Sequence, residues 1–175
     1  MIIRRLFIPF VLTYFMLSAA WTPRANADMV LLGTAFKSFV IFPLVTVSLY
    51  VSDRNLKDNV LDDVPKRIEV HYHVNVSKKE LDRQTIDGIK RNFSGNELIA
   101  LMPKINQIDS YYPDIRAGDR ICVTYMPGIG SQVQINGSIK GLVPGPDFAK
   151  AFFSIWVGKN PVDQKAKYKL LGQKD

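Results

Sequence analysis

Apolar and polar residues alternate with a period of two in the first third of the chain, and this pattern is typical of β-strands. The segment 30–51 is rich in β-branched and aromatic residues and is interpreted as two strands or one long bent strand, with Pro43 at an edge or a bulge. After a polar loop with room for a short helical turn, the segment 66–74 reads KRIEVHYHV and has an apolar residue at every second position. This alternation predicts a strand with at least one buried face.

Helical spacing replaces the alternation after residue 76. Ser77 and Glu80 form a capping box, in which each side chain can bond a free backbone amide at the start of a helix. The helix that follows carries an apolar stripe that includes Leu81, and a second helix begins at about Asn96. Pro103 lies inside this second helix and predicts a kink or a division there.

The last third of the chain predicts a three-stranded meander and a further helix. Strands are expected near 120–126, 131–136 and 138–143, and the Asn-Gly pair between the last two is a strong hairpin signal. The glycines of this region are separated by strands, so they do not form a phosphate-binding loop, which needs a strand, a glycine loop and a helix in direct succession. A helix from Pro146 to Gly158 and a last short helix complete the chain. The order of elements predicts an α+β fold with a mainly antiparallel sheet and helices gathered on one face.

The first 27 residues have the features of a secretory signal peptide. Arg4 and Arg5 precede an apolar run of about 16 residues, and the segment ends in Ala-Asn-Ala at residues 25–27. The run is shorter than the roughly 20 residues of a membrane-spanning helix. We therefore expect cleavage after Ala27, a periplasmic domain from 28 to 175, and no stable membrane insertion of the mature chain.

Composition excludes several function classes. The net charge falls from +7 to +4 when the three arginines of the signal peptide are removed, and the remaining charges are dispersed, so nucleic-acid binding is not expected. Cys122 is the only cysteine and lies in a strand-like run, so it is interpreted as a buried side chain. His71 and His73 share one strand face, but two imidazoles are fewer than the three or four ligands of a usual metal site. We expect no metal and no cofactor.

Four stretches of the chain resemble the bacterial, exported branch of the chalcone isomerase-like proteins. They are LLGTAFK with the strand after it, PKRIEVHYHVNVSKKEL, YYPDIRAGDRICVTYMPGIGSQVQINGSIKG, and VPGPDFAKAFFSIWVGKNP. The resemblance implies an open-faced β-sandwich, in which a large antiparallel sheet carries a layer of helices on one face and a ligand cleft lies between them. It also implies one of two activities, because plant members cyclise chalcones to flavanones whereas non-catalytic relatives bind fatty acids.

The polar positions of the plant enzymes are mostly not polar in this chain. An arginine, a threonine, a tyrosine, an asparagine and a late helical hydroxyl of those enzymes fall here on Lys37, Val45, Leu81, Gly88 and Ile155, or Ser154 one residue away. Valine and leucine cannot orient a water molecule or donate to an oxyanion. We therefore expect no catalytic residues.

The expected function is the binding of an apolar carboxylate, such as a fatty acid, in the cleft between sheet and helices. Lys37 is predicted to meet the acidic head group, and the predicted walls are Phe36, Val45, Leu81, Phe152 and Trp156. Two alternatives stay open: an isomerase (intramolecular lyase) acting on an unknown small substrate, and an interaction module of the cell envelope. The sequence leaves the oligomeric state open.

Overall fold

The structure is a computed structural model that describes residues 29–39 and 42–173. The signal peptide predicted for residues 1–27 lies outside the described residues. Within them, no helix is both long enough and apolar enough to cross a membrane.

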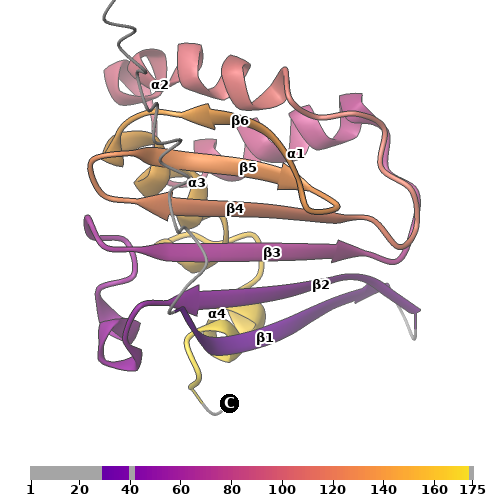
Figure 1. Ribbon diagram of the computed structural model, residues 1–175, viewed down its shortest axis with the longest axis horizontal. Helices are drawn as coiled ribbons and strands as arrows, with labels where there is room; N and C mark the ends of the chain where they lie inside the picture. The colour runs from indigo at the N-terminus through magenta and orange to yellow at the C-terminus, as the bar shows by residue number, and fades with distance from the viewer. Residues whose placement is uncertain (1–28, 40–41, 174–175) are drawn as a thin grey trace, which may run out of the picture.

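A single sheet of six antiparallel strands forms one layer of the molecule, with the strands in chain order from β1 to β6 (Figure 1). The strands are β1 Val30–Phe39, β2 Phe42–Val51, β3 Lys66–Tyr72, β4 Arg120–Met126, β5 Gly130–Ile135 and β6 Ser138–Val143. The segment 30–51 is therefore two paired strands, and the predicted meander is confirmed.

Side-chain alternation gives the sheet one buried and one open face. In β3 the apolar residues Ile68, Val70 and Tyr72 are buried, while the residues between them are only partly covered. The hairpin between β5 and β6 turns at Asn136 and Gly137, whose φ angles of 51° and 79° suit this pair of residues. The strand periodicity thus explains which face the helices cover.

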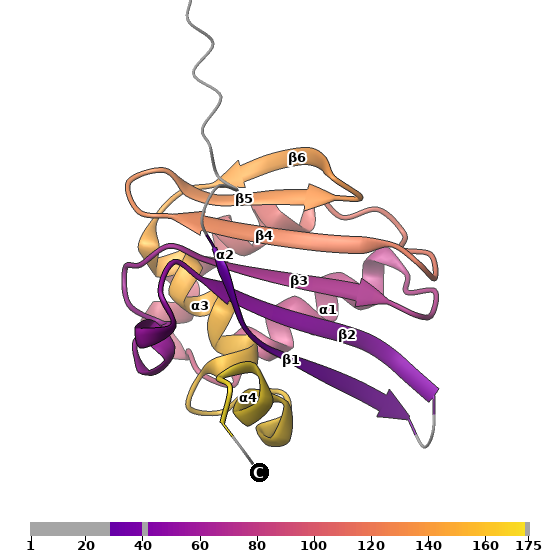
Figure 2. The same cartoon turned by 60° about the horizontal axis from the view of Figure 1, so that its bottom comes forward.

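The helices lie on that buried face (Figure 2). They are α1 Lys78–Lys90, α2 Gly95–Asp109, α3 Pro146–Val157 and α4 Gln164–Leu170, with a 3₁₀ turn η1 Arg54–Asp58 in the polar loop. The fold is thus the expected α+β open-faced sandwich.

Pro103 does not divide the second helix, because α2 runs through it. A proline removes the hydrogen bond to the carbonyl group four residues earlier. That residue is Ile99, which is 69% exposed, so solvent can hydrate the carbonyl group that the proline leaves free. Of the two outcomes expected at Pro103, the division is therefore wrong and the kink stays a prediction.

Two glycines allow close packing against the two outer strands of the sheet, β1 and β6. A Cβ atom on Gly33 of β1 would lie 2.0 Å from the carbonyl oxygen of Lys169, so only glycine lets α4 pack against this strand. At the other end, Gly141 of β6 faces the ring of Tyr111, where a Cβ would lie 2.2 Å from the ring. The side chains of Gln107 and Tyr111 then donate hydrogen bonds to the Leu142 carbonyl oxygen, at 2.9 and 3.4 Å.

A lysine is buried in the core beside the polar loop. Lys66 is 1% exposed, and its Nζ atom donates to the Asp62 carbonyl oxygen at 2.6 Å and lies 4.9 Å from the centre of the Tyr125 ring. Burial lowers the pKa of Lys66 to about 8, although the carboxylates of Asp63 and Asp62 oppose this shift. Lys66 therefore connects the loop to the sheet.

Candidate functional site

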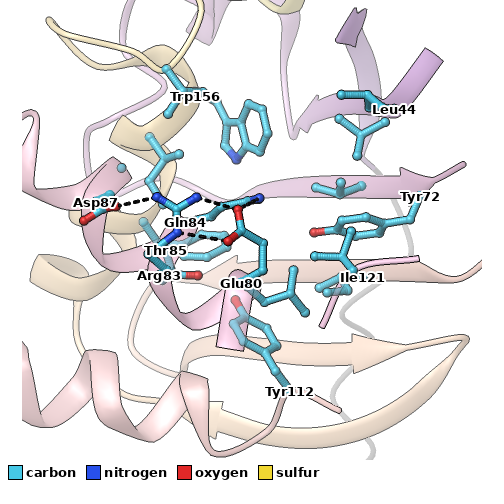
Figure 3. A pocket seen from close by; sticks show the side chains of 18 of the residues that line it. Leu44, Tyr72, Glu80, Arg83, Gln84, Thr85, Asp87, Tyr112, Ile121 and Trp156 are labelled. Carbon is cyan, nitrogen blue, oxygen red and sulfur yellow. Dashed lines mark hydrogen bonds and ion pairs between the residues drawn. The ribbon is translucent and has the colours of Figure 1, made fainter. Parts of the chain in front are cut away.

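A cavity of about 490 Å³ lies between the covered face of the sheet and helices α1 and α3 (Figure 3). Strands β2, β3 and β4 form one wall, and the two helices form the other. The apolar part of the lining consists chiefly of Leu44, Val45, Val70, Val74, Val76, Leu81, Ile121, Phe152, Ile155, Trp156 and Val162. The volume is within the range of roughly 300–1,000 Å³ that is usual for small-molecule sites.

The position of α1 depends on its cap and on one glycine. The Ser77 side chain accepts a hydrogen bond from the Glu80 backbone amide at 3.2 Å, which fixes the start of the helix beside the cavity. Further along α1, a Cβ atom on Gly88 would lie 2.8 Å from a side-chain carbon of Ile155, so glycine allows α1 and α3 to pack closely there. The two helices thus converge at Gly88 and leave the hollow beside this contact.

The charged residues of α1 at the edge of the cavity are paired with one another. Arg83 bonds Glu80 at 2.6 Å and Asp87 at 3.3 Å, and Gln84 donates to Glu80 at 2.7 Å (Figure 3). The hydrogen bonds from Arg83 and Gln84 lower the pKa of Glu80 to about 2. Glu80 is therefore a weak base, and the charge of Arg83 is already balanced.

Arg91 supplies a cation that is not balanced in this way. Its Nε atom donates to the carbonyl oxygens of Asn160 and Pro161 at 3.2 and 3.1 Å, and the side chain lines the cavity. Among the residues that the structure describes, no carboxylate forms an ion pair with it. Arg91 thus offers its remaining guanidinium donors to an acidic group.

Three hydroxyl groups line the cavity at its inner side. Tyr72 comes from the end of β3, Thr85 from α1, and Tyr112 from the segment after α2, and each residue is only 6–7% exposed. Burial raises the pKa of Tyr72. Burial also raises the pKa of Tyr112, while a hydrogen bond from Thr85 acts in the opposite direction. Both phenols are therefore protonated and can donate hydrogen bonds.

Four of the predicted wall residues meet at this cavity. Val45, Leu81, Phe152 and Trp156 all line it, although their role in binding stays a prediction. The sequence analysis did not assign Tyr72 to the cleft, because the alternation in β3 marks it as a core residue. The helical stripe also places Thr85 beside Leu81 without saying whether a hollow lies there.

Phe36 does not belong to this cavity, and its assignment as a cleft wall is corrected here. Its side chain is 64% exposed, and it pairs with Thr46, whose hydroxyl bonds His73 at 2.8 Å. Neighbouring side chains on a strand face opposite sides, so Phe36 and Lys37 cannot both face the helices. Lys37 pairs with Val45 in the strand register, but its side chain lies outside the described residues.

The two histidines lie on the open face of the sheet, away from the cavity. Their ring centres are 4.5 Å apart. Desolvation, followed by the positive charge of Arg120, lowers the pKa of His71. Within residues 29–39 and 42–173, no group of three or more histidine, cysteine or acidic side chains could hold a metal ion.

Comparison with known proteins gives one family and one similar fold. A family model described as chalcone isomerase-like matches residues 17–172. The crystal structure of a fatty-acid binding protein from Arabidopsis thaliana superimposes with a TM-score of 0.66 and 16% sequence identity, covering 84% of this chain and 88% of that one. No curated protein matches the chain significantly. At this level of identity, the structural likeness shows a shared fold.

Proposed function

The chain belongs to the chalcone isomerase-like family, and we propose that this member is a non-catalytic protein that binds an apolar carboxylate, such as a fatty acid. The observation that carries the proposal is the cavity of about 490 Å³ with apolar walls between the sheet and helices α1 and α3. The fold that the chain shares with a protein named as a fatty-acid binding protein supports the same assignment.

The apolar lining suits a hydrocarbon chain. Each methylene group that leaves water for such a lining contributes about 0.8 kcal/mol to binding. A cavity of this size is also an argument against an interaction module that binds no small molecule, because such a module has no need of a hollow within its core.

The acidic head group is assigned to Arg91. Arg91 lines the cavity and has no carboxylate partner among the described residues, whereas Arg83 already pairs with two. A charge-assisted hydrogen bond to a carboxylate is roughly twice as strong as a neutral one. Lys37, the cation expected from the sequence, stays a second candidate.

The absence of catalysis is supported by the groups at the cavity wall. Val45 and Leu81, which occupy positions of polar residues in the plant enzymes, both line the cavity and offer no proton donor or acceptor. Among the described residues, the carboxylates that line the cavity are Glu80 and Asp87, and Arg83 pairs with both. The pKa of Glu80, at about 2, is far below the range of an effective base at neutral pH. This pairing argues against an isomerase that uses a cavity carboxylate as its base.

Native mass spectrometry of the protein purified from the periplasm tests the proposal. We expect a bound lipid whose mass fits a fatty acid, and titration calorimetry with a panel of fatty acids should show binding. Arg91→Gln is expected to lower the affinity for an acid about tenfold or more while leaving the affinity for its methyl ester unchanged. Arg54→Gln, on the exposed turn η1, is the matched control. A protein that is empty and ignores every acid would refute the proposal.

We also propose that the protein is exported and that its mature form begins at Asp28. The charged start, the apolar run and the Ala-Asn-Ala sequence support this assignment. The intact mass of the protein from the periplasmic fraction is expected to equal that of residues 28–175. A full-length mass, or protein confined to the cytoplasm, would contradict it.

A further inference from the structure

Basic side chains gather at the corner of the molecule where the end of α1 meets the chain that leads into α4. Residues 158–173 hold four lysines and one aspartate, whereas the chain has a net charge of only +4 once the three arginines of the predicted signal peptide are removed. The fold adds two cations from the end of α1 to these lysines. We infer that this basic corner docks the protein on an anionic lipid surface. It consists of Lys90, Arg91, Lys159, Lys165 and Lys169.

Hydrogen bonds hold the parts of the basic corner together. The Arg91 Nε atom donates to the Asn160 carbonyl oxygen at 3.2 Å, and the Asn160 side chain donates to the Arg91 carbonyl oxygen at 3.0 Å. The Lys167 Nζ atom donates to the Gly158 carbonyl oxygen at 2.9 Å, which connects α4 to the same segment. The end of α1, the segment 158–162 and α4 therefore form one continuous part of the surface.

The charge of the basic corner is not balanced by acidic partners. All five of its residues are exposed, and among the residues that the structure describes none of them forms an ion pair. The acids closest in sequence are engaged elsewhere. Asp87 pairs with Arg83 at 3.3 Å, and Asp163 accepts a hydrogen bond from the Ala166 amide at 3.0 Å. The positive charge is therefore available to an anionic partner.

Aromatic residues beside the lysines favour a lipid surface over an acidic protein as that partner. Tyr168 lies on the same side of α4 as Lys165 and Lys169, at helical spacing, and is 40% exposed. Trp156 and Val162 flank the segment that carries Lys159, and both are partly exposed. Tyrosine, tryptophan and lysine each combine an apolar body with a polar end, and proteins place them at the level of lipid head groups. A bilayer of anionic phospholipid offers a partner to both ends.

Docking at the basic corner brings the cavity close to the lipid. Arg91, Trp156 and Val162 line the cavity and also belong to this part of the surface. A ligand that leaves the cavity beside them would enter the bilayer without crossing bulk water. This link to ligand exchange rests on the proposed function, whereas the docking itself requires no ligand.

The affinity for lipid is expected to depend on the lysines and on salt. Each lysine close to an anionic membrane surface contributes about fivefold to the partition coefficient, so three lysines contribute about 100-fold. The screening length falls from about 10 Å at 0.1 M salt to about 3 Å at 1 M. High salt should therefore release the protein from the vesicles.

Co-sedimentation of the ligand-free mature chain with sucrose-loaded vesicles tests the inference. The vesicles consist of phosphatidylcholine alone or of phosphatidylcholine in which about a third is replaced by phosphatidylglycerol. We expect binding to the mixed vesicles, reversed by about 1 M salt, and no binding to the neutral vesicles.

Two triple variants separate the basic corner from net charge. The variant with Lys159→Gln, Lys165→Gln and Lys169→Gln should bind the mixed vesicles about 100-fold more weakly. The control replaces three cations outside the corner that are exposed and, in the described ranges, form no ion pair. It should stay within about threefold of the unaltered protein. Its changes are Lys79→Gln, Arg116→Gln and Lys140→Gln. Lys167 is kept in both variants, because it bonds the Gly158 carbonyl and lines a groove that also contains Asp58.

Thermal unfolding checks that both variants are folded. Equal losses in the two variants would show that net charge alone attracts the protein to lipid. No binding of the unaltered protein to the mixed vesicles would leave the corner to an acidic macromolecule. Either result overturns the inference. Neither result bears on fatty-acid binding, because titration calorimetry measures that binding without vesicles.

Discussion

Ligand chain length gives a quantitative test of the cavity. If each non-hydrogen atom needs about 30 Å³, the volume that one water molecule takes in the liquid, then 490 Å³ holds about 16 such atoms. This corresponds to a saturated acid of about 14 carbons. Each added methylene contributes about 0.8 kcal/mol, or about fourfold in affinity, as long as it is buried. We expect the affinity to rise about fourfold per carbon up to about 14 carbons and then to stay constant.

A substitution at the cavity wall should move this limit. Val45→Phe adds about four non-hydrogen atoms at a half-buried position that lines the cavity, so the plateau should begin at about 10 carbons. Phenylalanine is compatible with a strand, so β2 should keep its register. The control Phe36→Val makes the opposite exchange, from phenylalanine to valine, at an exposed position of β1. It should leave the plateau unchanged, because Phe36 does not line the cavity.

Titration calorimetry with saturated acids of 8 to 18 carbons, each kept below its critical micelle concentration, measures the series. Thermal unfolding of both variants checks that they are folded. An affinity that does not depend on length, or a plateau that is the same in Val45→Phe and in the unaltered protein, would show that the chain does not lie in this cavity.

Three further predictions concern stability. Burial is the main cause that raises the pKa of Asp109 from 3.8 to about 7, and the negative charge of Asp82 adds to it. The native state therefore binds the Asp109 proton more tightly than the unfolded state does, and the free energy of unfolding falls as the pH rises from about 4 to about 7. Asp109→Asn should therefore stabilise the protein at pH 8 by about 2 kcal/mol and have little effect at pH 4, as measured by urea unfolding; equal effects at both pH values would contradict this. Gly33→Ala should cost about 3 kcal/mol in thermal unfolding, because its Cβ would overlap a backbone carbonyl of α4, and a change below 1 kcal/mol would refute that contact. Ser77→Ala should cost about 1 kcal/mol, whereas Ser94→Ala, whose side chain makes no cap hydrogen bond, should cost much less in the same assay; equal losses would contradict the difference.

The fold was predictable because its signals are local. The alternation in β3, the capping box at Ser77 and the Asn136-Gly137 turn each determine an element without reference to distant residues. The division of the second helix at Pro103 was predicted wrongly. The effect of a proline depends on whether solvent reaches the carbonyl group that it leaves free, and this exposure is a property of the packed molecule.

The candidate site was predictable only in part. Leu81 and Phe152 follow from helical stripes that must face the sheet, and both line the cavity. Phe36 failed because a strand places alternate residues on opposite faces, and the sequence does not say which of two apolar-rich faces the helices cover. Tyr72 and Thr85 were missed because a hollow between packed layers depends on where α1 and α3 converge, which no single segment encodes.

The hydrogen bonds of Gln107 and Tyr111 to the Leu142 carbonyl have a consequence for self-association. The outer strand of an open sheet presents unpaired backbone groups that can recruit a strand from another molecule. Here two side chains occupy one of those backbone acceptors, and the exposed Lys140 puts a charge on the same strand. A second chain would have to displace both side chains and bury that charge before it could extend the sheet, so this edge resists growth into fibres.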